Sequence, residues 1–170
     1  MDDPLLQRVV DELDIRCLLA RLAQSADDRD VEAYRGCFAD QVLCPEDRSG
    51  VGPLHWISSE AYARSAIDSI LALDWIHHRL SNFIITVGGD AAHARVDLVA
   101  EMQSSNEEGV LEWFTLGGRY EIELARLPVG WRIARRSRLV RYTIGDPSVV
   151  ERAKLRRAKQ QAQAPCRHGD

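Results

Sequence analysis

The sequence predicts an α+β fold in which helices come first and a strongly curved, mainly antiparallel sheet follows. Up to residue 71, apolar residues recur at the three-to-four-residue spacing of amphipathic helices. After residue 74 the spacing changes to two, and long alternating runs follow one another with only short turns between them. Helices that precede consecutive strands cover one face of the sheet. We therefore expect three N-terminal helices on a sheet that curls around them into a cone with a cavity inside, plus a C-terminal helix.

Capping residues locate the three N-terminal helices. The first begins at Asp3-Pro4, an N-cap followed by proline at the first helical position, and runs to about Ala26. Asp30 is the expected N-cap of a short second helix. Ser58-Ser59-Glu60 begins a third, because cap residues there precede an acid in the first turn. The apolar stripe of the first helix contains Leu5, Leu6, Val9, Val10, Leu13, Cys17 and Leu18.

Four long strands are expected after the change of period, over about 74–87, 92–102, 110–124 and 131–143. Gly88-Gly89-Asp90 has the composition of a hairpin turn between the first two strands. Gly117-Gly118, inside the third strand, indicates a bulge or bend. Residues 40–53 are expected to form a loop with one short strand over 41–44, and 45–50 have the composition of a turn.

The C-terminal end is rich in Lys, Arg, Gln and Ala. Asp146-Pro147 begins a helix expected to run to about 164; it has few apolar residues, so we expect a surface or interface helix or a partly disordered tail. Residues 165–170 are expected to be disordered. We accordingly divide the chain into one domain over 1–145 and a C-terminal helix and tail over 146–170.

Bulk properties exclude several classes of partner. The 170 residues suffice for one domain with a real core, and the net charge of −4 offers no basic surface for nucleic acid or anionic lipid. No apolar run reaches membrane-spanning length, and the acidic N-terminus lacks the features of a signal peptide. The four cysteines form no CxxC pair or regular framework. We therefore expect a cytoplasmic protein with reduced thiols that binds neither nucleic acid nor membrane.

The strongest candidate site lies at the start of the first strand, over 74–82. Alternate residues of a strand share a face, so His78 and Asn82 are expected to point together among aliphatic side chains, while His77 points away. An apolar wall with two convergent polar groups is typical of a small-molecule pocket. The alternative interpretation is that His78 is a hydrogen-bonded core histidine.

No metal or organic cofactor is expected. The chain has five histidines, none of which pair at helical ligand spacing, and His77 and His78 diverge on a strand. Gly88-Gly89 belongs to a hairpin turn and not to a phosphate-binding loop.

Taken in order, several short motifs resemble those of the nuclear transport factor 2-like superfamily, in its SnoaL-like, polyketide-cyclase-like branch. The resemblance covers about residues 5 to 143 and implies a cone-shaped α+β fold. Relatives of this fold include scytalone dehydratase, the bile acid 7α-dehydratase, hexachlorocyclohexane dehydrochlorinase, ketosteroid isomerase, aromatic polyketide cyclases and the small subunits of ring-hydroxylating dioxygenases. The matching residues are Ile15 with Leu18, Asp27 to Asp30 with Tyr34 and Phe38-Ala39-Asp40, His78 with Asn82, Gly89 to Ala92, Gly117 to Tyr120, and Trp131-Arg132-Ile133 with Arg136.

The resemblance implies a pair of catalytic residues. In the dehydratase-like members an aspartate at the end of the first helix pairs with a histidine on the first long strand, and these positions fall at Asp27 and His78. An arginine of the last strand that lines the cavity falls at Arg136. A carboxylate that accepts the Nδ1 proton fixes the tautomer of an imidazole and raises its basicity, so the other ring nitrogen can remove a proton from carbon.

A tyrosine that the dehydratases use near the aspartate is missing, because Leu22 and Ala26 occupy the nearby positions. Tyr34, Tyr120 or Tyr142 could supply a hydroxyl in its place, and Tyr34 and Tyr120 are carried forward as substrate-binding candidates with Arg136 and Asn82. Each residue also has a structural interpretation. Residues 27–30 could be a solvated helix end, and Arg136 could belong to an exposed basic strand over 135–138.

Two functions remain open. The first is a cofactor-independent lyase or isomerase, dehydratase- or cyclase-like, that acts on a hydrophobic cyclic, polyketide-like or steroid-like molecule. The second is a non-catalytic ligand-binding module or the small subunit of a ring-hydroxylating dioxygenase. We also expect a homodimer or homotrimer, because Phe83, Ile85 and Val87 are predicted on the face opposite His78, which leaves both faces of that strand in need of cover. The resemblance points the same way, since relatives pair through the outer face of this sheet.

Overall fold

The computed structural model describes residues 3–46 and 52–163. The turn predicted over 45–50 therefore lies partly outside the described residues, and the tail over 165–170 lies wholly outside them. The elements are α1 (Pro4–Asp27), α2 (Val31–Arg35), β1 (Phe38–Pro45), β2 (Leu54–Ser58), α3 (Ser59–Asp68), β3 (Trp75–Gly88), β4 (Ala91–Ser105), β5 (Leu111–Leu127), β6 (Gly130–Gly145) and α4 (Val149–Gln163).

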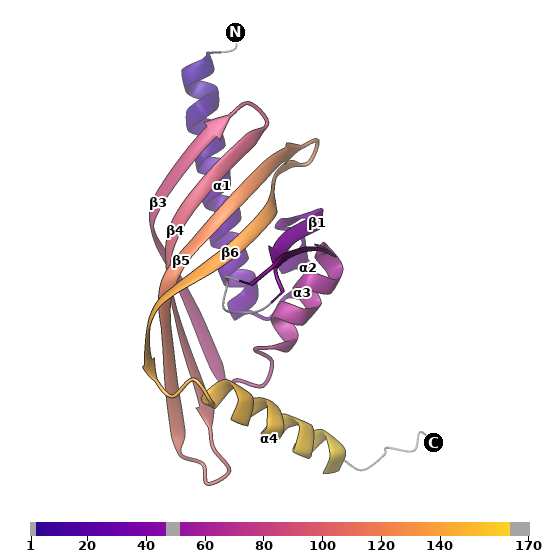
Figure 1. The fold of residues 1–170 in the computed structure, drawn as a ribbon, viewed down its shortest axis with the longest axis vertical. Coiled ribbons are helices and arrows are strands. Elements are labelled where there is room, and N and C mark those ends of the chain that lie inside the picture. Colours follow the sequence, from indigo (N-terminus) through magenta and orange to yellow (C-terminus); the bar gives the residue numbers. More distant parts are fainter. Residues whose placement is uncertain (1–2, 47–51, 164–170) are drawn as a thin grey trace, which may run out of the picture.

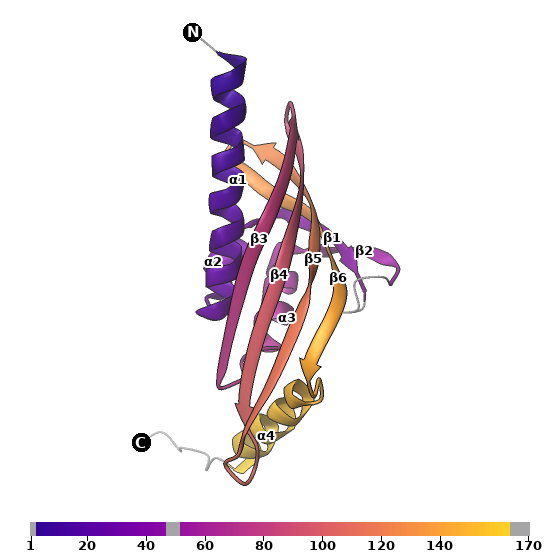
Figure 2. The ribbon, with the colours of Figure 1, turned by 90° about the vertical axis from the view of Figure 1, so that its left-hand side faces the viewer.

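A single six-stranded sheet, in the order β2-β1-β6-β5-β4-β3, curves around the helices (Figure 1). Neighbouring strands are antiparallel except for β1 and β6, which are parallel. The long helix α1 runs beside the edge strand β3, and α4 lies across the other end of the sheet (Figure 2). The predicted α+β fold with a curved sheet and a C-terminal helix is therefore confirmed.

The concave face of the sheet forms the core with α1. The alternation predicted for β4 is confirmed, because every second residue of that strand is buried. Each of these residues points toward the helical layer, as a period of two requires. The buried side chains of β4 are Ala92, Ala94, Val96, Leu98, Ala100, Met102 and Ser104, and those of α1 include Ile15, Leu18, Leu19 and Leu22.

Helix α1 begins as predicted: the Asp3 side chain accepts a hydrogen bond from the backbone nitrogen of Leu5 at 2.9 Å. Its first turns project past the sheet (Figure 2), so the apolar side chains between Leu5 and Leu13 remain exposed there. The packed part of the helix is anchored by Asp11. Its carboxylate accepts hydrogen bonds from Nη1 and Nη2 of Arg126, each at 2.6 Å, and from Nε1 of Trp131 at 3.2 Å.

Two stretches differ from the sequence prediction. Residues 40–53 are predicted as a loop with one short strand over 41–44. That strand lies within the longer β1, and the unpredicted β2 follows directly after this range; the two pair with each other and join the sheet through β6. These strands depend on partners distant in sequence, so their local patterning is weak. The C-terminal helix begins at Val149 and not at Pro147, because the Asp146 side chain bonds the backbone nitrogen of Ser148 in a turn ahead of the helix.

Strand β3 contains an irregularity that reverses its two faces. The pairing with β4 shifts between Ser81 and Ile84, and Asn82 has a φ of 51°. An extra residue in one strand reverses the alternation beyond it. Phe83, Ile85 and Val87 therefore pack against the core, while Ile84 is 60% exposed. The prediction that these three residues lie opposite His78 is wrong, and with it that argument for an oligomer.

Among the residues that the structure describes, no helix combines the length and apolar character needed to cross a bilayer.

Candidate active site

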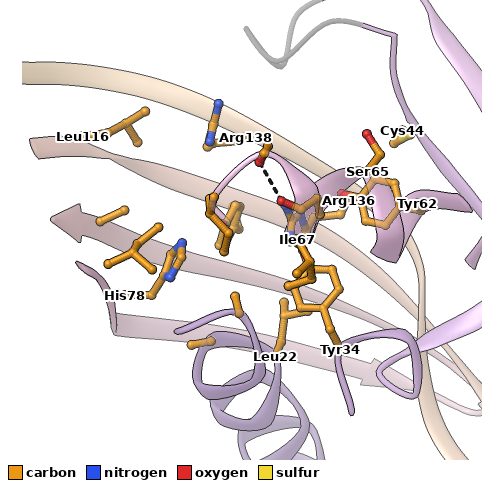
Figure 3. A pocket seen from close by; sticks show the side chains of 18 of the residues that line it. Leu22, Tyr34, Cys44, Tyr62, Ser65, Ile67, His78, Leu116, Arg136 and Arg138 are labelled. Carbon is orange, nitrogen blue, oxygen red and sulfur yellow. Dashed lines mark hydrogen bonds between the residues drawn. The ribbon is translucent and has the colours of Figure 1, made fainter. Parts of the chain in front are cut away.

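A cavity of about 550 Å³ lies between the helices and the concave face of the sheet. Its wall is mostly apolar, with polar side chains on opposite sides (Figure 3). His78 from β3 lies on one side, and Arg136 from β6 lies on the other with Tyr62 and Cys44. The volume falls within the range of small-molecule sites. Apolar lining residues include Leu22, Ala26, Ile67, Ile70, Ile76, Leu80, Met102, Phe114 and Leu116.

Asp27 is in direct contact with His78, which lines the cavity. Oδ1 of Asp27 lies 2.6 Å from Nδ1 of His78, and both side chains are largely buried. The backbone nitrogen of His78 also donates to both carboxylate oxygens, at 3.1 and 3.0 Å. The neutral imidazole therefore carries its proton on Nδ1 and leaves Nε2 free to act as an acceptor. The family resemblance implies this pairing, and the structure brings the two residues within hydrogen-bonding distance.

Local structure explains why Asp27 reaches this position. Strand β3 is the edge of the sheet, so outward-pointing backbone N–H groups need partners from elsewhere. Asp27 lies in the last turn of α1 and supplies one. Arg29 follows with a φ of 59° and donates from Nη2 to the carbonyl oxygen of Leu73 at 2.9 Å. The helix end is thus tied to the residues that lead into β3.

His77 contacts the same carboxylate from the outer side of the strand. Its Nδ1 lies 3.3 Å from Oδ2 of Asp27, its side chain is half exposed, and its ring stacks on that of Trp75 with centroids 5.9 Å apart. It points away from the cavity, as the alternation predicted. The sequence did not indicate that it would share Asp27 with His78.

The other side of the cavity holds a guanidinium among tyrosines. Nη1 of Arg136 donates to Oη of Tyr34 at 2.7 Å. Its guanidinium carbon lies 4.7 Å from the ring centroid of Tyr120 and 5.6 Å from that of Tyr62. Burial raises the pKa of Tyr34 and of Tyr62, so both phenols keep their protons. The structure therefore places Arg136, Tyr34 and Tyr120 together at the cavity.

Asn82 does not belong to this site. It lies within the irregular part of β3, where its side chain is exposed and Nδ2 donates to Oδ2 of Asp97 at 2.9 Å. The prediction that it shares a face with His78 is wrong, because the shift in pairing turns it away. Tyr142 also lies elsewhere, across from Gly117 on the outer face of the sheet.

Several lining residues were not predicted, including Cys44, His55, Tyr62 and Ser65. They come from β1, β2 and α3, and the strand patterning of β1 and β2 is weak. Burial raises the pKa of the Cys44 thiol, which makes it a poor nucleophile. Over 3–46 and 52–163, no group of three or more His, Cys, Asp or Glu side chains is arranged to hold a metal ion.

Residues 7–137 match the SnoaL-like domain. The chain belongs to the SnoaL-like family. No protein of curated function matches it.

Solved structures share the fold of this SnoaL-like chain. A protein assigned as an aromatic ring hydroxylase from Novosphingobium aromaticivorans shares 25% identity over 84% of this chain and 97% of its own, with a TM-score of 0.70. A protein from the same organism assigned as a scytalone dehydratase shares 17% identity over 82% of this chain and 89% of its own, with a TM-score of 0.66. A hexachlorocyclohexane dehydrochlorinase (LinA, type 2) shares 16% identity over 85% of this chain and 94% of its own, with a TM-score of 0.68.

Proposed function

We propose that this SnoaL-like protein is a cofactor-independent lyase or isomerase that acts on a hydrophobic cyclic small molecule, polyketide-like or steroid-like. The observation that carries the proposal is the 2.6 Å contact between Asp27 and His78 at the wall of a mostly apolar cavity. A carboxylate that bonds Nδ1 makes Nε2 a base, and an apolar cavity excludes the water that would compete for the proton.

The reaction begins with proton removal from carbon. Nε2 of His78 takes a proton from a carbon next to a carbonyl or conjugated group, and the C–H electron pair moves onto the carbonyl oxygen to form an enolate. Asp27 holds the ring and stabilises the imidazolium. When the enolate collapses, it expels a hydroxyl group that takes the proton from His78 and leaves as water. If the proton returns to a different carbon, the product is an isomer. These steps use neither a metal nor an organic cofactor.

The relatives support the class of reaction. The names of the dehydratase and the dehydrochlorinase denote removal of water and of hydrogen chloride, and both proteins share the fold. Applied to this chain, that likeness favours elimination, with isomerisation and aldol cyclisation as further outcomes of the same first step. Arg136, on the other side of the cavity, is the cationic group suited to hold a substrate oxygen.

A second candidate is a non-catalytic ligand-binding module or a small subunit of a ring-hydroxylating dioxygenase. Its support is the likeness to the protein assigned as an aromatic ring hydroxylase, together with the absence of a tyrosine beside Asp27. A chain of this kind would bind aromatic ligands without turnover and would co-purify with a large oxygenase subunit.

Proton exchange in D₂O tests the enzyme proposal without knowledge of the natural substrate. The purified protein is incubated with a panel of cyclic β-hydroxyketones and β,γ-unsaturated ketones of one to four rings, and NMR follows deuterium incorporation and product formation. We expect exchange or elimination with at least one compound, and its loss in His78→Ala. Exchange that is unchanged in His78→Ala would exclude His78 as the base. Binding without any exchange across the panel would favour the second candidate.

A further inference from the structure

The side of the cavity opposite His78 contains the positive charge of Arg136. Over 3–46 and 52–163, Arg136 forms no ion pair, and its polar contact is the single hydrogen bond to Tyr34. The guanidinium otherwise faces the rings of Tyr62 and Tyr120. Arginine stays protonated at any working pH, so this is a permanent charge in a largely apolar cavity.

Burial of such a charge is unfavourable unless an opposite charge or hydrogen bonds compensate for the lost hydration. Removing a cation from water is unfavourable, and the contacts with one neutral phenol and two aromatic ring faces offset only part of that desolvation penalty. Elsewhere the chain provides acids. Arg126 bonds Asp11, and Arg156 bonds Asp74. Arg136 differs from these structural arginines in facing the cavity with donor capacity left over.

The acids that line the cavity do not neutralise Arg136. Glu46 is exposed, and Glu151, in the first turn of α4, bonds Nζ of Lys154 at 2.7 Å. The potential on this side of the cavity therefore favours an anionic ligand group.

We propose that Arg136 and Tyr34 form a subsite for a carboxylate, so that the substrate class is a cyclic apolar carboxylic acid. This inference rests on the proposed function for the events at His78. Nη1 of Arg136 is used by Tyr34, which leaves Nε and Nη2 to donate to the two oxygens of a carboxylate. Tyr34 accepts from Arg136 and keeps its own hydroxyl proton, which it can donate to the same anion.

The carboxylate serves as an anchor and not as the reacting group. His78 and Arg136 belong to β3 and β6, which are separated by two strands and lie on opposite sides of the cavity (Figure 3). Three inter-strand spacings amount to roughly 14 Å across the sheet. The register adds an offset along the strands, because His78 is level with Thr143 of β6 and not with Arg136. A ligand that reaches both residues therefore carries its carboxylate several rings away from the carbon that His78 deprotonates.

Matched acid and amide probes test this subsite. Isothermal titration calorimetry would measure binding of benzoate, 2-naphthoate, a phenanthrene carboxylate and a steroid carboxylate, each beside its carboxamide, which has the same shape but no charge. We expect at least one carboxylate to bind tenfold or more tighter than its amide. Arg136→Gln should abolish the preference and leave amide binding in place, while Arg136→Lys, with its charge intact, should keep part of it. Equal binding of acid and amide, or failure of every carboxylate to bind, would overturn the proposal.

Repeating the titrations in His78→Ala separates this inference from the proposed function. We expect the carboxylate preference to survive, because His78 lies away from Arg136. A preserved preference in a protein whose turnover does not depend on His78 would leave the subsite standing and reject the mechanism. If acid and amide bind equally while turnover depends on His78, the carboxylate subsite would be rejected and the mechanism at His78 would stand.

Discussion

The carboxylate of Asp27 holds both the ring and the backbone of His78. One oxygen lies 2.6 Å from Nδ1, and both lie within 3.1 Å of the backbone nitrogen. The backbone contacts fix the carboxylate against the edge of the sheet, so it meets the imidazole in a single orientation. A base held in this way loses little entropy when it meets the substrate.

Replacing His78 by alanine should abolish most turnover. The loss of a general base reduces rates by roughly two to four orders of magnitude. His77→Gln is the matched control, because that histidine contacts the same carboxylate but points away from the cavity. Its turnover should stay within about threefold of the native rate, as it removes no group that meets the substrate. Steady-state kinetics on a substrate found by the exchange screen would measure both, and similar losses in the two variants would contradict the assignment.

Asp27→Asn should lower turnover roughly a hundredfold or more while the fold survives. An amide cannot stabilise the imidazolium and favours the wrong tautomer. Since the two residues act as one unit, the Asp27→Asn/His78→Ala double variant should be about as slow as His78→Ala alone. Circular dichroism would verify folding. Additive losses in the double variant would show that Asp27 acts independently of His78.

The ion pair between Asp11 and Arg126 should make stability depend on pH in acid. Hydrogen bonds from Arg126, joined by those from Trp131 and Gln7, lower the pKa of Asp11 from 3.8 to about 2. A carboxyl group whose pKa is lower in the folded state stabilises the fold above its unfolded pKa, and this contribution is lost as the pH falls from about 4 toward 2. Asp11→Asn should reduce the free energy of unfolding by about 3 kcal/mol at pH 7 and flatten that pH dependence.

Asp90→Asn is the control for this pair. Asp90 also contacts Arg126, at 3.2 Å from Nε, but its side chain is 86% exposed. Its replacement should change the unfolding free energy by no more than about 0.5 kcal/mol. Urea unfolding at several pH values would measure both variants, and equal effects would refute the special role of Asp11.

Adjacent glycines in β5 should differ in their tolerance of alanine. A Cβ at Gly118 would lie 2.2 Å from the backbone carbonyl oxygen of Leu139, whereas one at Gly117 would lie 2.0 Å from the ring of Tyr142. The exposed Tyr142 ring can move away, but the carbonyl of a paired strand cannot. Gly118→Ala should therefore destabilise the fold by about 3 kcal/mol, and Gly117→Ala by clearly less. Thermal melts would reveal the order, and a reversed order would count against the register of β5 and β6.

A homo-oligomer remains a prediction, now with a different physical basis. The outer face of the sheet exposes Trp75 and Trp113, whose ring centroids lie 5.9 Å apart. Tyr142 and Ile144 are exposed on the same face. Apolar surface of this kind favours association. Light scattering at micromolar concentration should show a dimer or trimer that Trp113→Glu shifts toward monomer. Leu6→Glu, on the exposed start of α1, should have no such effect, and a shift in that variant alone would place the contact on the helix.

The sequence by itself determined the features that depend on short segments of chain. The cap at Asp3, the alternation of β4 and the irregularity at Gly117 and Gly118 all follow from residues within one turn or one strand. The pairing of Asp27 with His78 was predicted from the resemblance to a family, since no local pattern relates residues 51 positions apart.

Tertiary structure alone decided the rest. The shift in β3 after Ser81 depends on pairing with β4, and it removed Asn82 from the cavity and turned Phe83 inward. Arg136 meets the tyrosines because β6, α2, α3 and β5 converge, and no local pattern contains that convergence. Periodicity reports which face a residue shares with its near neighbours. The position of a bulge and the partners across a cavity are set by contacts between distant segments, and these decide which of the predicted residues form one site.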